Sequence, residues 1–323
     1  MSKILKKATR ESFGEALAEI ARFNEKIVVL DSDLAAATKT KIFKEAFADR
    51  FFNCGISECN MIGVGAGLAT MGKIPFVASF AMFSAGRGFE QIRNSVAYPN
   101  LNVKIAGSHA GISVGEDGAT HQCCEDIALM RSIPNMVVLN PCDHYEMKAA
   151  VKSAADHMGP VYIRLGRLAV ETINDEETYK FEMGKGVTLK DGKDITIIAT
   201  GLPVRAALLA SKLLENDKIS ARVINIHTIK PLDREIILKA AAETSQIFTV
   251  EEHSIIGGLG EAVCSVVCEK FPKRVQRIGI DDRFGQSGSA HDLLAHYKLD
   301  SKGIYQTIKN KLGWSRNYYD NGR

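Results

Sequence analysis

The sequence lacks several features that would decide the class of a protein at once. No apolar run reaches the length needed to span a bilayer, so we expect no membrane association. No run of Lys or Arg stands out and the net charge is only +3, so nothing points to a nucleic acid or an anionic membrane as a partner. The basic amino-terminal residues lead into no apolar segment, so we expect no signal peptide there.

The cysteines show no pattern that indicates a disulfide framework or a metal site. The seven cysteines are an odd number, are scattered, and form no C-x-x-C pair. Neither a disulfide framework nor a zinc site is indicated by such spacing. We therefore expect buried, reduced thiols in a cytoplasmic protein and no metal ligands within this chain.

What the chain has is a repeated alternation of short apolar stretches with helical patterns. Residues 26–31 and 161–164 are typical of buried strands, whereas residues 11–23 and 143–156 are typical of amphipathic helices. The pattern predicts an α/β fold with two domains, each with a mostly parallel sheet flanked by helices. A polar stretch near residues 171–193 divides the chain. We expect one domain in residues 1–175, a linker in 176–193 and a second domain in 194–323.

Four polar or aromatic segments each follow a predicted strand of the first domain. They are Asp31–Asp33, Gly55–Glu58, Phe80–Phe83 and Ser108–His121. Ligands bind outside the carboxyl ends of strands in open parallel sheets. We therefore expect these segments to meet at one edge.

The most informative of them reads SHAGISVGEDGATHQ, residues 108–122. It brings together His109, the adjacent carboxylates Glu116 and Asp117, and His121, with glycines between them. Two histidines flanking two carboxylates favour contacts to a polar substrate, because the spacing fits no trusted metal motif.

Glu58 stands at the predicted start of an apolar helix. A carboxylate there is favoured by the helix dipole, so a plain capping role is one interpretation. The helix, however, carries Gly63, Gly65 and Gly67 and almost no charge, which indicates close packing and a partly desolvated carboxylate. A functional carboxylate is the interpretation we favour.

Aromatic and basic residues near the same edge have two interpretations as well. Phe80, Phe83 and Phe89 could be ordinary core or a shelf for a flat ring. Arg164 and Arg167 lie at the end of the last strand of the first domain and could bind a phosphate or form ion pairs. In the second domain, Gly257–Gly260 could bind an anion at a helix start, although tight packing is the simpler interpretation.

Taken together, these segments resemble the C-terminal part of transketolase from about residue 9 almost to the end of the chain. The pieces that carry the resemblance are ATRESFGEAL, GISECNMIGVGAGLA, HAGISVGEDGATHQ, RSIPNMVVLNPCD, IRLGRL and GIDDRFGQSG. Transketolases are thiamine-diphosphate enzymes with a diphosphate-binding, a pyrimidine-binding and a C-terminal domain. This chain resembles the last two.

The resemblance implies a role for individual residues. Glu58 matches the glutamate that hydrogen-bonds N1′ of the aminopyrimidine, and Phe80, Phe83, Phe89 and Asp33 match other cofactor-site positions. His109 and His121 match substrate-contacting, catalytic histidines. Asp117 matches the aspartate that reads a donor hydroxyl, and Arg10 and Arg167 match the sugar-phosphate arginines. One departure is Ala37, near which a phosphate-contacting serine is expected.

The family's diphosphate and Mg²⁺ signature, GDG followed by Asn, does not occur in this chain. The resemblance therefore implies one subunit of a split transketolase, whose partner carries that motif and holds most of the contacts to Mg²⁺ and the diphosphate. Self-association through the pyrimidine domain would give an α₂β₂ assembly that moves a two-carbon ketol unit between sugar phosphates.

Three alternatives remain open. The β-subunits of 2-oxo-acid dehydrogenase decarboxylases have a similar length, but their loop usually lacks the Glu-Asp-Gly run. The 1-deoxyxylulose-5-phosphate synthases share part of the loop. A purely regulatory subunit would be expected to lose Glu58, which is present.

Overall fold

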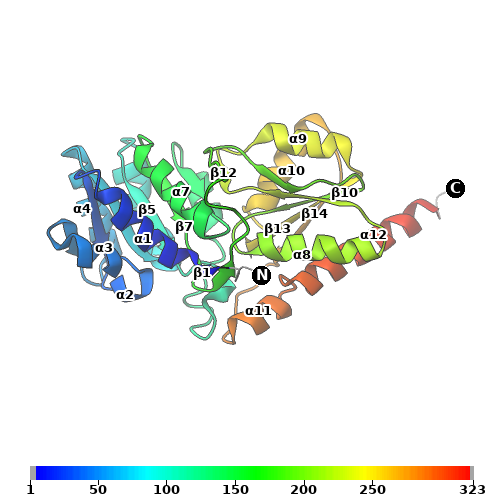
Figure 1. The fold of residues 1–323 in the computed structure, drawn as a ribbon, viewed down its shortest axis with the longest axis horizontal. Helices are drawn as coiled ribbons and strands as arrows, with labels where there is room; N and C mark the ends of the chain where they lie inside the picture. Colours follow the sequence, from blue (N-terminus) through cyan, green and yellow to red (C-terminus); the bar gives the residue numbers. More distant parts are fainter. Residues whose placement is uncertain (1–4, 321–323) are drawn as a thin grey trace.

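The computed structural model describes the backbone of residues 5–320 and the side chains of residues 5–312. It consists of two α/β lobes side by side, the amino-terminal one on the left in Figure 1 and the carboxy-terminal one on the right. Helix α12 (Ser301–Asp320) runs along the outside of the second lobe to the end of the described chain.

The first lobe is built on a seven-stranded sheet whose central strands are parallel. All residues of β2, β4 and β5 are buried, as expected for strands covered on both faces. In spatial order the strands are β12 (Thr228–Lys230), β6 (Val137–Leu139), β7 (Val161–Arg164), β5 (Lys104–Ser108), β4 (Ile74–Phe80), β2 (Ile27–Asp31) and β3 (Phe51–Asn53).

Each face of this sheet carries its own hydrophobic core. On one face, α1 (Thr9–Ala21), α3 (Lys41–Ala46) and α7 (His144–Asp156) bury side chains such as Phe13 and Val151. On the other face lie α4 (Glu58–Thr70) and α6 (Asp126–Ser132), together with the segment from η2 (Met82–Arg87) through α5 (Phe89–Gln91) to η3 (Ile92–Ala97).

The second lobe has a five-stranded sheet with the order β14 (Val275–Ile280), β13 (Gln246–Ser254), β10 (Ile195–Ala199), β11 (Ala221–Asn225) and β9 (Val187–Lys190). Only β9, at one edge, is antiparallel to its neighbour. One face is covered by α8 (Pro203–Asn216), α11 (Ala290–His296) and α12, and the other by α9 (Arg234–Glu243) and α10 (Leu259–Lys270).

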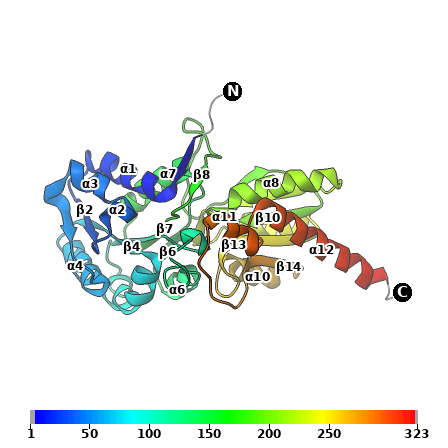
Figure 2. The same cartoon turned by 90° about the horizontal axis from the view of Figure 1, so that it is seen from below.

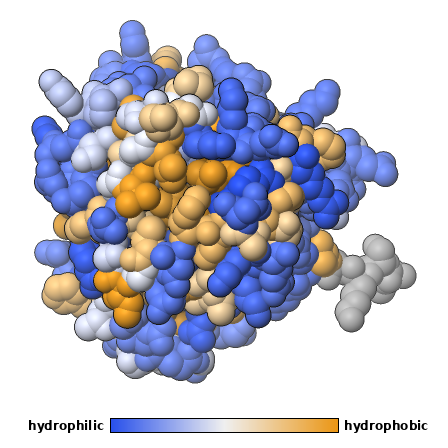
Figure 3. Space-filling view, turned by 90° about the vertical axis from the view of Figure 1, so that its left-hand side faces the viewer, coloured by the Kyte–Doolittle hydropathy of each residue, from blue (hydrophilic) through white to orange (hydrophobic). Residues whose placement is uncertain are grey.

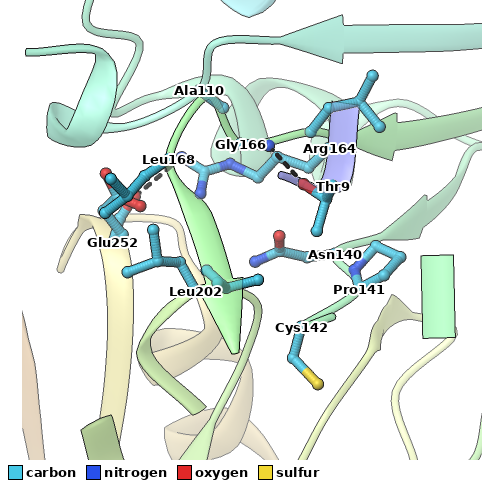
Figure 4. Close-up of a pocket in the computed structure, with 12 residues that line it drawn as sticks. Thr9, Ala110, Asn140, Pro141, Cys142, Arg164, Gly166, Leu168, Leu202 and Glu252 are labelled. Atoms are coloured by element: carbon cyan, nitrogen blue, oxygen red, sulfur yellow. Dashed lines mark hydrogen bonds between the residues drawn. The ribbon is translucent and has the colours of Figure 1, made fainter. Parts of the chain in front are cut away.

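The two lobes are joined by strand pairing and by buried contacts. Strand β12 comes from the second half of the chain but extends the first sheet by pairing with β6. A short ribbon of β1 (Lys6–Ala8) and β8 (Ala169–Glu171) lies near the junction (Figure 2). A cavity of about 20 Å³ lies between the lobes. Figure 4 shows residues of both lobes that line it, such as Arg164 and Leu202. A space of this size holds about one water molecule.

The expected fold class is confirmed: both lobes are α/β layers around mostly parallel sheets. The stretch expected as a linker contributes β9, which its polar composition did not predict. The short strands β1, β8 and β12 and the helices α11 and α12 were not predicted either. Within residues 5–320, no helix has the length and apolar character required to cross a membrane.

Candidate active site

Glu58 is the first residue of α4 and is only 1% exposed. Its carboxylate does not cap its own helix. Oε1 lies 3.4 Å from the hydroxyl of Ser79 on β4, and Oε2 accepts a hydrogen bond of 2.6 Å from Nη1 of Arg87. A buried carboxylate needs such partners, because its desolvation is otherwise costly. The carboxylate is therefore held at the carboxyl end of β4, as a functional group would be.

A cluster of four rings lies at the same edge. The rings of Phe80 and Phe83 are stacked with centroids 5.9 Å apart and planes within 9°. His109 stacks on Phe80 at 3.9 Å, and His121 meets Phe83 edge-on at 5.3 Å. Phe89 was expected here as well, but it packs against the hydrophobic core that contains Ile62.

His109 is held in a fixed tautomer by its neighbours. Its Nε2 lies 3.3 Å from Nη1 of Arg10, and its Nδ1 lies 2.8 Å from the hydroxyl of Ser108. Since a guanidinium can only donate, Nε2 must accept and the proton must be on Nδ1. Burial lowers the pKa of His109 to about 3, and Arg10, Arg167 and His121 contribute to the same shift. The imidazole is therefore neutral at physiological pH.

The backbone of His109 adopts φ 56°, a left-handed conformation that costs energy in a residue with a side chain. Contacts between this loop and the second lobe hold the backbone in this strained conformation. A Cβ on Gly111 would collide with the carboxylate of Glu252, and one on Gly118 would lie 2.5 Å from Oγ of Ser287. Glu252 also accepts from the backbone N–H of Ser113 at 2.6 Å. The second lobe therefore buttresses the loop that carries both histidines.

Two arginines bring positive charge to this loop. Nη1 of Arg10 donates to the backbone oxygen of Ala37 at 2.8 Å, and its buried Nε has no hydrogen-bond partner among the described residues. Arg167 donates to the backbone oxygen of Val114 and, at 3.0 Å, to Glu116, whose pKa is held low by a backbone hydrogen bond and by Arg167. Guanidinium groups with donors left over suit a phosphate or carboxylate.

Asp33 and Asp117 are both exposed at this edge of the sheet. Asp33, with φ 63°, lies two residues beyond the end of β2 and accepts a hydrogen bond of 2.9 Å from the side-chain nitrogen of Asn53, the last residue of β3. Asp117 lies in the same loop as His121. The strand-end segments singled out from the sequence therefore do converge, as β2, β3, β4 and β5 are parallel neighbours.

Two other sequence candidates have structural roles. Arg164 is 4% exposed and forms a buried ion pair with Asp126, so it is not available to a ligand. The glycine-rich start of α10 does bind an anionic group, but that group is the carboxylate of Glu251, which accepts from the N–H groups of Leu259 and Gly260. Burial raises the pKa of Glu251 to about 7.

The sequence did not reveal the pairing of Arg87 with Glu58. The partner of Arg87 is 29 positions earlier in the chain, and the contact exists only because η2 packs on α4.

The arrangement combines a buried carboxylate, a shelf of stacked rings, a neutral histidine and two arginines at one edge. A carboxylate beside stacked rings suits a flat heterocycle with a hydrogen-bonding ring nitrogen. The histidines and arginines suit a hydroxylated, anionic substrate.

Two family models match the chain. "Transketolase, pyrimidine binding domain" covers residues 6–172, and "Transketolase, C-terminal domain" covers residues 184–304. Together they span most of both lobes.

Individual proteins are similar over nearly the whole chain. The "Putative transketolase C-terminal section" of Methanocaldococcus jannaschii is 52% identical over 95% of this chain and 96% of its own length. A 6-deoxy-6-sulfo-D-fructose transketolase subunit of a Clostridium species is 43% identical over 91% of each. Human transketolase is 38% identical over 94% of this chain but only 49% of its own length. A solved structure described as "Split gene transketolase, inactive beta4 tetramer" superposes with a TM-score of 0.88 at 50% identity, covering 94% of this chain and 98% of that one.

Proposed function

The chain belongs to the transketolase family, and we propose that it is the C-terminal subunit of a split, thiamine-diphosphate-dependent transketolase. The enzyme would transfer a two-carbon ketol unit from a ketose phosphate to an aldose phosphate. The observation that carries the proposal is the buried carboxylate of Glu58 beside the stacked rings of Phe80 and Phe83. The site would lie at the carboxyl edge of the first sheet.

The residues present fit the aminopyrimidine half of thiamine diphosphate. Glu58 supplies a buried carboxylate for a ring nitrogen, and Phe80 and Phe83 supply apolar ring faces. When bound, the cofactor supplies the carbon nucleophile of the reaction. Glu58 would hold the pyrimidine and exchange a proton at its N1′ nitrogen, while the rings exclude water from that side. Asp33 completes the proposed cofactor contacts.

The substrate would be held by the neighbouring loop and arginines. The neutral ring of His109 would line the sugar site, and a sugar hydroxyl could donate to its Nε2 only in place of Arg10, which donates to that nitrogen in this structure. His121 and Asp117 would read further hydroxyls, and His121 would move protons at the reacting oxygens. Arg10 and Arg167 would bind the phosphate end of the sugar. Because Ala37 has no polar side chain, the phosphate would be bound by the arginines and by backbone groups.

The diphosphate and Mg²⁺ contacts would come mainly from a second subunit that carries the GDG motif, since the motif does not occur in this sequence. The similar protein of Methanocaldococcus jannaschii, described as a C-terminal section and matched over 96% of its own length, supports this division. The similar split-gene transketolase is described as an inactive tetramer of β chains, which also agrees with a need for a partner.

Self-association is proposed through the first lobe, in an α₂β₂ complex. Figure 3 views the side on which α3 and α4 lie and shows apolar surface across the middle of this face. In and next to α4, the exposed fractions of Ile56, Val64 and Met71 are 79%, 40% and 80%. Contiguous apolar surface of this kind is typical of subunit interfaces.

The proposal is tested by reconstitution. The chain is mixed with the product of a neighbouring gene that encodes GDG followed by Asn, and the two are checked for co-purification. The complex with thiamine diphosphate and Mg²⁺ should convert xylulose 5-phosphate and ribose 5-phosphate, or another ketose and aldose phosphate pair, whereas either chain alone should not. Turnover of 2-oxo acids with lipoyl acceptors in place of sugar phosphates would instead favour the dehydrogenase alternative.

A further inference from the structure

The side chain of Arg87 closes over the carboxylate of Glu58. Its Nη1 donates to Oε2 at 2.6 Å, and its guanidinium carbon lies 4.8 Å from the centre of the Phe83 ring. The Arg87 side chain is 50% exposed, whereas that of Glu58 is 1% exposed. One cation from the surface thus contacts both the carboxylate and one of the rings that the proposed function assigns to the pyrimidine.

The backbone around Arg87 is clamped to α4. A Cβ on Gly88 would lie 2.2 Å from Cδ1 of Ile62 and 2.8 Å from the backbone oxygen of Ser84, so Gly88 packs directly against α4. The thiol of Cys59 donates to the backbone oxygen of Arg87 at 3.4 Å. Ile62 follows Glu58 by one helical turn, so these contacts hold the backbone of Arg87 beside Glu58. The half-exposed side chain can still pivot toward solvent.

We propose that Arg87 is a displaceable partner of Glu58, which neutralises the buried carboxylate before the cofactor binds and must release it to the pyrimidine ring. This inference rests on the proposed function, because it takes the pyrimidine as the incoming group. The pairing is strong, since charge-assisted hydrogen bonds exceed neutral ones and a buried carboxylate is costly to leave alone. Arg87 therefore opposes cofactor binding and makes it depend on an exchange of partners at Glu58.

The exchange predicts a gain of affinity when Arg87 is removed. In Arg87→Met, Glu58 keeps only the long contact to Ser79, so the incoming ring displaces nothing and restores a lost partner. Calorimetry of thiamine diphosphate and Mg²⁺ binding to the reconstituted complex should give a Kd about tenfold lower than that of the unchanged complex. Arg93→Met removes another exposed arginine of the same segment, one that donates to Asn94, and should leave the Kd unchanged.

The pairing itself is tested without cofactor. Arg87→Met should lower the Tm of the chain alone, and the same change in a Glu58→Gln background should lower it little, because a neutral amide does not need the cation. In that background the gain of cofactor affinity should also vanish. A Kd that is unchanged or higher in Arg87→Met would overturn the inference while leaving the proposed function standing. If the unchanged complex binds no thiamine diphosphate, the inference about Arg87 and the proposed function both fail. This holds even if the Tm data show that Arg87 pairs with Glu58.

Discussion

Nη1 of Arg10 lies 3.3 Å from Nε2 of His109, although the two residues are 99 positions apart. The contact joins the start of α1 to the loop after β5, at the edge where the proposed sugar site lies. A cation that donates to an imidazole also disfavours protonation of that imidazole, because the protonated ring would be a second cation with no lone pair.

His109 should therefore remain neutral over the whole range of assay pH. Its pKa is lowered to about 3, first by burial and then by Arg10, Arg167 and His121. In two-dimensional NMR, the ring signals of His109, assigned by their loss in His109→Gln, should not titrate between pH 5 and 8. In Arg10→Met the midpoint should rise, since one cationic neighbour is gone. A midpoint near 6.5 in the unchanged protein would contradict this electrostatic picture.

Arg167 should distinguish phosphorylated from unphosphorylated substrates. Arg167→Ala removes a charge-assisted contact of about 1.5–3 kcal/mol, so the KM for a ketose phosphate should rise about 10- to 100-fold. Hydroxypyruvate, which has no phosphate, should be much less affected. Arg205→Ala is the matched control, because Arg205 lies on the second lobe and is paired with Glu171. An equal loss for both donors would make Arg167 a structural residue.

Glu58 should be essential for turnover. Glu58→Gln keeps the size of the side chain but cannot exchange a proton with the pyrimidine, so kcat of the complex should fall about 100-fold or more. Glu45→Gln alters an exposed carboxylate of α3 that pairs with Lys41, and its kcat should stay near that of the unchanged complex. Near-normal turnover by Glu58→Gln would refute the assignment.

The buried pair of Asp126 and Arg164 should matter for stability. Burial alone would raise the pKa of Asp126, but the charge and hydrogen bonds of Arg164 lower it overall. Asp126→Asn leaves Arg164 buried without its counter-charge and should lower the free energy of unfolding by about 3–5 kcal/mol in urea titrations. The double variant with Asp126→Leu and Arg164→Met should lose less free energy of unfolding than Asp126→Leu alone and Arg164→Met alone lose together. Simple additivity would show that the two residues are not coupled.

Much of this site could be predicted because the strand ends carry unusual residue types. The alternation of strands and helices placed Glu58, Phe80 and His109 at one edge, and the structure brings them together. Phe89 and Arg164 could not be placed in this way. Whether an aromatic ring faces a pocket or the core, and whether an arginine meets a ligand or Asp126, depends on packing between segments far apart in sequence.

Strands β9 and β12 were not predicted from the sequence for the same reason. Strand β12 has only three residues and is a strand because it pairs with β6 of the other lobe. Strand β9 lies in a polar stretch and is stabilised by pairing with β11. Both segments contain β-branched residues, but three or four residues in polar surroundings do not identify a strand without knowledge of the partner strand.

Calorimetry tests most directly whether this chain carries only the pyrimidine half of a shared cofactor site. Thiamine diphosphate with Mg²⁺ is titrated into the isolated chain and into its complex with the GDG-bearing subunit. Binding by the chain alone should be weak, because the ligands of the diphosphate and Mg²⁺ lie on the partner, and binding by the complex should be tight and Mg²⁺-dependent. Tight, Mg²⁺-dependent binding by the isolated chain would contradict a shared site.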